Sequence, residues 1–325
     1  MRNVLVLACS AAVVFLGGST WLGFYPPVPS DLGGVRNLDA TAQHVRIPVG
    51  DRDALDGWYL PPENGAVIVI LHGYGRDHTR AWRYGSFLRR AGYGLLVFDF
   101  RSSRSAARLP TTLGYYEMVD ARAALDWLES QPGSDGFRVG MLGESLGGSV
   151  GITTTAASPD VRALVVDCPF ANGGEALEDA CERWAHMPRW PSAIILRAIG
   201  RLATGHDPGT LDAVNAAAAL RNRPVLFIQS VKDNRLGPRQ TEQLWQAAGA
   251  KDPLWIIADA GHNEGWKRHR ALYERRVQAF FDHALLGRGS GLPPGNLGGA
   301  TELARGGAVS GPAVAAVLSA PALTR

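Results

Sequence analysis

The stretch Gly143-Glu144-Ser145-Leu146-Gly147 decides the fold that we expect for this chain. It fits Gly-x-Ser-x-Gly, a pattern in which the serine sits on a sharp turn between a strand and a helix. Residues 137–142 before it predict a short buried strand, and residues 146–157 after it predict a helix of small and apolar residues. The alternative is a glycine-rich turn with an incidental serine. The flanking strand and helix favour a nucleophile elbow, with Ser145 as the nucleophile.

A second glycine-rich loop lies upstream of the elbow. Residues 67–71 are fully apolar and mostly β-branched, which predicts a buried parallel strand. The strand runs into His72-Gly73-Tyr74-Gly75, at the position where such a fold supplies one oxyanion-hole amide. We expect the backbone N–H groups of Tyr74 and Leu146 to bind the oxyanion, each contributing roughly 10²–10³ in rate. The phenol of Tyr74 has no part in this prediction.

Two further strands each lead into a residue that suits a catalytic triad. Residues 224–229 run towards Asp233, and residues 253–258 run towards His262. An open α/β sheet places its catalytic groups at the carboxyl ends of its strands. The order Ser145, Asp233, His262 is also the triad order of the fold that carries this elbow. We therefore expect Asp233 to be the triad acid and His262 the base.

Asp167 is the alternative acid, because it ends the strand predicted at residues 161–166. It is followed by Cys168-Pro169-Phe170, a stiff apolar turn. That context favours a structural carboxylate that caps backbone amides. Asp233 lies in a polar loop that can bend towards His262, and it remains the preferred assignment.

These motifs together resemble the α/β-hydrolase-fold serine hydrolases. The similarity covers residues 38–286, and it is strongest to the bacterial serine aminopeptidase-like, dienelactone-hydrolase-like and prolyl-oligopeptidase-like branch. It implies a mostly parallel central sheet flanked by helices, with a small helical cap inserted after the sixth strand. Many relatives have Arg-Gly-His-Gly where this chain has Arg101-Ser102-Ser103-Arg104. This loop borders the active site in the family, so it carries no inference about substrate.

The chain divides into five predicted segments. Its 325 residues are 46% hydrophobic, which suffices for one large core. We expect a membrane anchor or signal peptide at residues 1–25, a linker at 26–38, and the α/β-hydrolase domain at 39–286. Within the domain, residues 172–206 are expected to form the cap, although an extended crossover helix would also fit. Residues 287–325 are rich in Gly, Ala, Pro and Ser, and predict a disordered tail.

The first residues carry a localisation signal. Residues 4–25 contain no charged side chain and are long enough to span a bilayer. A cleaved secretory signal with an apolar region at residues 4–16 is the alternative. An uncleaved anchor is the preferred interpretation. In either case the short basic start favours a catalytic domain outside the cytoplasm.

The predicted activity is acyl-transfer hydrolysis of a small-molecule carboxylic ester through a covalent acyl-enzyme. Peptidase, amidase and acyltransferase activities would use the same serine, and a membrane-tethered binding module without activity is a weaker alternative. No cofactor or metal is expected, since zinc-ligand spacing, a P-loop and a dinucleotide motif are all missing from the sequence. The net charge of +3 predicts no nucleic-acid partner. Cys168 and Cys181 could pair if the domain is exported. The oligomeric state is left open.

Overall fold

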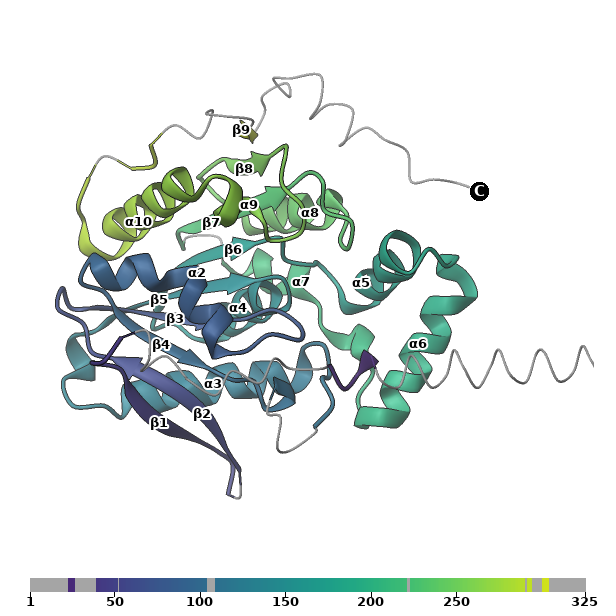
Figure 1. Cartoon of the computed structure of the whole chain (residues 1–325), viewed down its shortest axis with the longest axis horizontal. Helices are drawn as coiled ribbons and strands as arrows, with labels where there is room; N and C mark the ends of the chain where they lie inside the picture. The colour runs from purple at the N-terminus through teal and green to yellow at the C-terminus, as the bar shows by residue number, and fades with distance from the viewer. Residues whose placement is uncertain are drawn as a thin grey trace, which may run out of the picture.

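The computed structural model describes residues 23–26, 39–51, 53–103, 109–220, 223–289, 291–293 and 300–303. A nine-stranded sheet forms its centre, in the order β1-β2-β4-β3-β5-β6-β7-β8-β9 (Figure 1). The strands are β1 (Gln43–Val49), β2 (Asp53–Leu60), β3 (Ala66–Leu71), β4 (Gly94–Phe98), β5 (Arg138–Glu144), β6 (Val161–Asp167), β7 (Val225–Ser230), β8 (Leu254–Ile257) and β9 (Ala300–Leu303). Strands β4, β3, β5, β6, β7 and β8 are parallel neighbours, whereas β1, β2 and β9 pair antiparallel at the edges.

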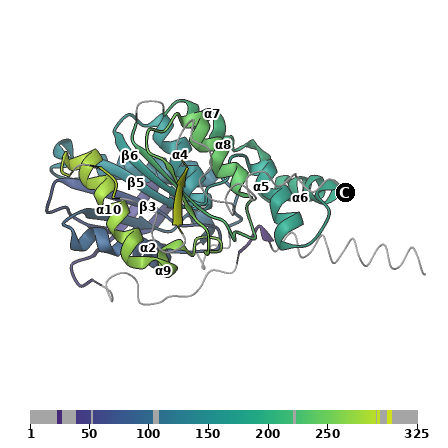
Figure 2. The ribbon, with the colours of Figure 1, turned by 90° about the horizontal axis from the view of Figure 1, so that it is seen from above.

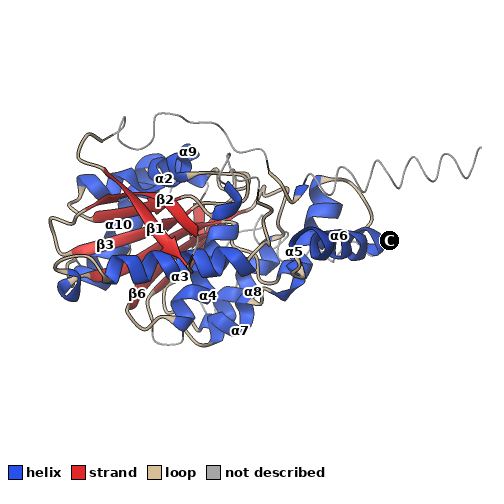
Figure 3. Cartoon of the chain, turned by 90° about the horizontal axis from the view of Figure 1, so that it is seen from below, coloured by secondary structure: helices blue, strands red, loops and turns tan. Residues whose placement is uncertain are grey.

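Helices cover both faces of the sheet, as Figures 2 and 3 show. The α-helices are α2 (His78–Arg90), α3 (Tyr115–Glu129), α4 (Leu146–Ala157), α5 (Gly173–Asp179), α6 (Arg189–Thr204), α7 (Ala213–Ala218), α8 (Pro238–Ala248), α9 (Gly265–Arg268) and α10 (Arg270–Leu286). Short helical segments are η2 (Arg101–Ser103), η3 (Ser134–Gly136), the π-helical turn η4 (Ala180–Trp184) and η5 (Pro208–Thr210). The predicted fold class, a mostly parallel sheet flanked by helices, is confirmed.

The core lies in two layers, one on each face of the sheet. Alternate residues of β3 point to opposite faces, so Val67 and Val69 join one apolar cluster while Ile68 and Ile70 join the other. The first cluster also contains residues of α3, α4, α7 and α8, and the second contains residues of α2 and α10. Every residue of β3 is buried, which explains its continuous apolar sequence.

Local signals in the sequence set the ends of several helices. Asp77 caps α2, because its side chain accepts hydrogen bonds from the amides of Thr79 and Arg80. Helix α8 begins with Pro238 at its first position, and Gly249, which adopts a φ of +62°, follows its last residue as the C-cap. These signals fix where α2 and α8 meet the carboxyl edge of the sheet, and therefore where the loops around the site begin.

The segment between β6 and β7 contains α5, η4 and α6. Helices α5 and α6 lie at one end of the molecule, beyond the edge of the helical layers (Figures 1 and 2). The predicted cap at residues 172–206 falls on these helices, and their role as a cap stays a prediction. Two large apolar side chains of α6, Trp190 and Leu202, are 74% and 80% exposed. Gly200 on the same helix lies so close to Phe24 that a side chain there would collide with its ring.

The predictions for the two ends of the chain have different outcomes. The anchor or signal at residues 1–25 and the linker at 26–38 lie outside the described residues, apart from residues 23–26. None of the described helices is both long and apolar enough to cross a bilayer. The predicted disordered tail at 287–325 is wrong in part, because Ala300–Leu303 forms strand β9 beside β8. A strand pairs at the edge of a sheet through its backbone hydrogen bonds. The scarcity of large apolar side chains in the tail therefore did not prevent β9 from pairing with β8.

Candidate active site

Ser145 occupies the turn between β5 and α4. Its backbone has a φ of +52° and a ψ of −120°, a conformation that non-glycine residues rarely adopt. The neighbouring positions have no room for side chains. A Cβ atom on Gly143 would lie 2.3 Å from the carbonyl oxygen of Gly147, and one on Gly147 would lie 2.2 Å from that of Leu71. Only glycine fits at both positions, as the elbow motif requires.

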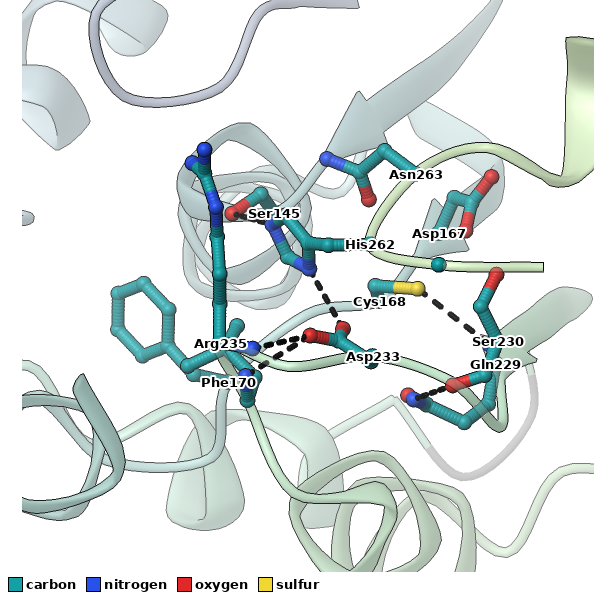
Figure 4. A network of polar contacts seen from close by, with 12 residues as sticks. Ser145, Asp167, Cys168, Phe170, Gln229, Ser230, Asp233, Arg235, His262 and Asn263 are labelled. Atoms are coloured by element: carbon teal, nitrogen blue, oxygen red, sulfur yellow. Dashed lines mark hydrogen bonds and ion pairs between the residues drawn. The ribbon is translucent and has the colours of Figure 1, made fainter. Parts of the chain in front are cut away.

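The three residues predicted for the triad form one continuous chain of hydrogen bonds (Figure 4). Nε2 of His262 lies 2.9 Å from Oγ of Ser145, and its Nδ1 lies 2.5 Å from Oδ2 of Asp233. The side chain of Asp233 is fully buried, and that of His262 is only 9% exposed. Residues that are 117 and 29 positions apart in the sequence thus meet at the carboxyl edge of the sheet.

The remaining oxygen of Asp233 is held by backbone amides. Oδ1 accepts hydrogen bonds from the amides of Arg235 at 2.8 Å and Leu236 at 2.9 Å. The guanidinium of Arg183 also donates to the backbone carbonyl of Asp233, at 2.7 Å. These contacts fix the loop after β7, so that the second carboxylate oxygen points at the imidazole.

His72 sets the orientation of the loop that contains Tyr74. Its Nδ1 lies 2.9 Å from the carbonyl oxygen of Gly73, and its Nε2 accepts from the amide of Phe100 at 3.2 Å. The second contact leaves the proton on Nδ1, which donates to Gly73. In a trans peptide the following N–H points opposite to the carbonyl. The buried imidazole of His72 therefore fixes the direction of the Tyr74 amide.

Leu146 supplies the second predicted amide. It is the first residue of α4, and the first amides of a helix have no acceptor within the helix. Tyr74, Ser145 and Leu146 all line the same cavity. Whether the two amides act as the oxyanion hole stays a prediction.

Asp167 makes no contact with His262 among the described hydrogen bonds. Its Oδ2 instead accepts hydrogen bonds from the hydroxyls of Tyr84 and Tyr273, the latter at 3.2 Å. The expectation that it caps backbone amides is therefore wrong, since tyrosines of α2 and α10 are its partners. Burial raises the pKa of Asp167 to about 6, and burial together with the nearby carboxylate raises the pKa of both tyrosines well above 10.

Glu144, the residue before Ser145, forms a buried ion pair with Arg80 that the sequence did not predict. Arg80 of α2 donates to it from Nε and Nη2, with the shortest contact at 2.7 Å, and Glu144 is only 2% exposed. The guanidinium also lies over the rings of Tyr84 and Trp266. Burial opposes the charge of Arg80, but Glu144 outweighs it, so the pKa of Arg80 is raised. No local motif links residues 64 positions apart.

Cys168 lies next to the predicted acid and base. Its Sγ, a carboxylate oxygen of Asp233 and a ring nitrogen of His262 all lie within 4.8 Å of one another. Thiolate is the form that binds metal, and burial raises the pKa of Cys168 well above 9. The donor set is therefore poorly suited to a metal at neutral pH. Cys168 and Cys181 are both free thiols in the structure.

Two cavities meet at the serine and share Tyr74, Ser145, Arg235 and His262. One cavity, of about 440 Å³, runs beneath α5 and α6 and is mainly apolar. Its apolar lining includes Leu113, Leu146, Phe170, Leu177, Met187 and Leu236. The other, of about 420 Å³, is lined mostly by charged and polar residues of the loops around β3, β7 and β8. One side of Ser145 is therefore apolar, and the other side is polar and charged.

The chain is similar to several known proteins. The protein YqkD of Bacillus subtilis is 25% identical over 232 residues, which is 70% of this chain and 75% of YqkD. The esterase Pf2001 of Pyrococcus furiosus has a similar structure, with a TM-score of 0.65, 22% identity, and coverage of 80% of this chain and 97% of that one. The acylaminoacyl peptidase of Pyrococcus horikoshii gives a TM-score of 0.59 at 18% identity, covering 78% of this chain and 43% of that one.

The family described as X-Pro dipeptidyl-peptidase (S15 family) matches residues 58–270. This range runs from β2 into the start of α10, so it contains the elbow, the loop after β7 and the loop after β8. The two similar structures show the same fold at lower identity. The predicted resemblance to serine hydrolases of this fold is confirmed. The chain belongs to the X-Pro dipeptidyl-peptidase (S15) family and is a hydrolase of the α/β-hydrolase fold.

Proposed function

We propose that this hydrolase cleaves carboxylic esters through Ser145, His262 and Asp233. The observation that carries the proposal is the unbroken chain from Oγ of Ser145 to Nε2 of His262, and from Nδ1 to the carboxylate of Asp233. A serine at an elbow, a base within hydrogen-bond distance and a buried orienting acid are the three parts of nucleophilic acyl transfer.

The mechanism follows from these contacts. Oγ of Ser145 attacks the ester carbonyl carbon while Nε2 of His262 removes its proton. The resulting imidazolium donates this proton to the leaving alcohol, and the acyl group remains on the serine. A water molecule then attacks the acyl-enzyme, with His262 again acting as base, and the carboxylic acid leaves. Asp233 holds the proton on Nδ1, so that Nε2 is free to accept one.

The negative oxygen that forms during both attacks needs hydrogen-bond donors. The amides of Tyr74 and Leu146 are the proposed donors, and each is set in place before substrate binds. His72 orients the first, and the N-terminus of α4 presents the second. Donors that need no rearrangement stabilise the transition state more than water does.

An ester is preferred over a dipeptide substrate because of the charges around Ser145. A dipeptidyl-peptidase has to hold a free N-terminal ammonium, which calls for a carboxylate close to the serine. The lining of the apolar cavity contains no Asp or Glu among the described residues. The polar cavity contains three, Glu144, Asp259 and Glu264, and these face Arg80, His269 and Arg268 respectively. An uncharged, apolar acyl group fits this environment better.

A peptidase or amidase is the second candidate, since the family match and the acylaminoacyl peptidase both point to amide substrates. Three chromogenic substrates separate the two proposals: 4-nitrophenyl octanoate, octanoyl 4-nitroanilide and glycyl-prolyl 4-nitroanilide. Our proposal predicts that the octanoate ester has the highest kcat/KM by at least about a hundredfold. Faster turnover of the glycyl-prolyl substrate would establish the peptidase instead.

A further inference from the structure

Two cavities lie beside Ser145, so the two halves of a bound substrate have separate spaces to occupy. Both contain Tyr74, Ser145 and His262, so a molecule held at the serine extends into both. The leaving oxygen has to lie within reach of Nε2 of His262, which protonates it. Residues 259–268, the segment that contains His262, supply seven of the sixteen residues that line the polar cavity, but only His262 of the apolar one. The leaving alcohol therefore occupies the polar cavity, and the acyl group occupies the apolar one beneath α5 and α6.

The polar cavity has an excess of positive charge. Its lining contains six basic side chains, Arg76, Arg80, Lys232, Arg235, Lys267 and Arg268, against three acidic ones. Two of the acidic side chains have close partners: Glu144 is 2.7 Å from Arg80, and Asp259 is 2.7 Å from the imidazole of His269, which lies outside the lining. Glu264 lies 3.8 Å from Arg268. Each of the three carboxylates therefore already has a basic side chain beside it.

Three of the six cations remain available to a ligand. Arg76, Lys232 and Lys267 are exposed, and none of them forms an ion pair within the part of the chain that the structure describes. Nζ of Lys267 lies 5.9 Å from the centre of the ring of Trp266, and this uncharged ring does not neutralise the ammonium. Lys232 directly precedes the triad residue Asp233, so its side chain belongs to the same loop as the acid.

We propose that the preferred substrates are esters of an apolar acyl group with an alcohol that carries an anionic group, either a carboxylate or a phosphate. This inference rests on the proposed esterase function and adds the class of the leaving group. Arg76, Lys232 and Lys267 attract the anion, while the apolar cavity selects the acyl chain. The cations select between substrates and take no part in bond cleavage.

The test uses octanoyl esters of matched phenols that differ only in a distant charge. The phenols are 4-hydroxyphenylacetate, its neutral amide, 4-hydroxybenzylphosphonate and a 4-(trimethylammoniomethyl)phenol. We expect kcat/KM to be about tenfold higher for the two anionic esters than for the neutral one, and lowest for the cationic ester. The ratio of anionic to neutral should fall as the salt concentration rises from about 0.02 to 0.5 M, because exposed charges are screened.

A double variant, Lys232→Gln with Lys267→Gln, shows whether these side chains cause the preference. It should lower the ratio of anionic to neutral kcat/KM several-fold. Lys251→Gln is the matched control, since Lys251 is exposed and lies outside both cavities, and it should leave the ratio unchanged. Equal turnover of anionic and neutral esters by the wild type, or an unchanged ratio in the double variant, would overturn the inference while the esterase proposal stands. Failure to hydrolyse any of the esters would overturn both.

Discussion

The imidazole Nδ1 of His262 lies 2.5 Å from Oδ2 of Asp233, whereas Asp167, at the end of the neighbouring strand, contacts two tyrosine hydroxyls instead. Both carboxylates sit at the carboxyl edge of the sheet, and both are buried. Their partners nevertheless differ: Asp233 contacts the imidazole that also contacts Ser145, and Asp167 holds α2 and α10 against β6. Substitution of Asp233 should therefore lower activity, whereas substitution of Asp167 should mainly lower stability.

Substitution of the two acids tests this difference. Asp233→Asn should fold but lose activity by about 10⁴, because an amide stabilises the wrong imidazole tautomer, as in the serine protease template. Asp167→Asn should keep activity within about tenfold and mainly lower the thermal midpoint. Steady-state kinetics and thermal unfolding of both variants provide the measurement. An inactive, folded Asp167→Asn beside a nearly normal Asp233→Asn would reverse the assignment.

The raised pKa of Asp167 makes a prediction for stability against pH. Burial raises this pKa from 3.8 to about 6, so between these values the folded protein binds a proton that the unfolded chain has released. The free energy of unfolding then decreases as pH rises through this window. The contribution of Asp167 is fully present below about pH 4 and is lost above about pH 6, a change of about 3 kcal/mol.

Denaturant unfolding between pH 4 and pH 7 measures this contribution as the difference between the wild type and Asp167→Asn, which cannot titrate. Relative to the variant, the wild type should lose stability as pH rises. Asp135→Asn, whose side chain is exposed, controls for the loss of one charge. A difference between wild type and Asp167→Asn that does not change with pH would contradict the raised pKa.

The crowded elbow predicts that Gly147 cannot be replaced. A Cβ there would lie 2.2 Å from the backbone oxygen of Leu71, and backbone cannot move aside as a flexible side chain can. Gly147→Ala should destabilise the protein by roughly 1–3 kcal/mol or more and abolish activity. Gly136→Ala is the matched control, because a Cβ there meets no atom within 4 Å, and it should be nearly neutral. Normal activity in Gly147→Ala would mean that the turn is built differently.

Strand β9 predicts that the C-terminal tail contributes to stability. Deleting residues 290–325 removes β9 and also the carbonyl of Pro293, to which the buried Arg276 donates a hydrogen bond. Deleting only residues 304–325 leaves both in place. The longer deletion should lower the thermal midpoint by several degrees more than the shorter one, since it exposes the edge of β8. Equal midpoints for the two truncated proteins would show that β9 adds nothing to the fold.

The sequence was sufficient for those parts of the site that are encoded by local pattern. The elbow and the strands that lead to Ser145, Asp233 and His262 all follow from short motifs and apolar runs. The partners of Asp167 could not be predicted in this way. Tyr84 is 83 residues away in the sequence, and only the packing of α2 on the sheet brings it close. The pairing of Arg80 with Glu144 was missed for the same reason. Strand β9 was missed because the prediction for the tail used only its amino-acid composition. The pairing of β9 with β8 depends on backbone hydrogen bonds, which composition does not describe.

Covalent labelling of the nucleophile tests the central claim most directly. A fluorophosphonate probe reacts with an activated serine, and mass spectrometry of the digested protein locates the modified residue. We expect the wild type to carry one probe molecule, on Ser145, and Ser145→Ala to remain unlabelled and inactive while its thermal midpoint is nearly unchanged. Equal labelling of a folded Ser145→Ala, or a probe found on another serine, would contradict the account.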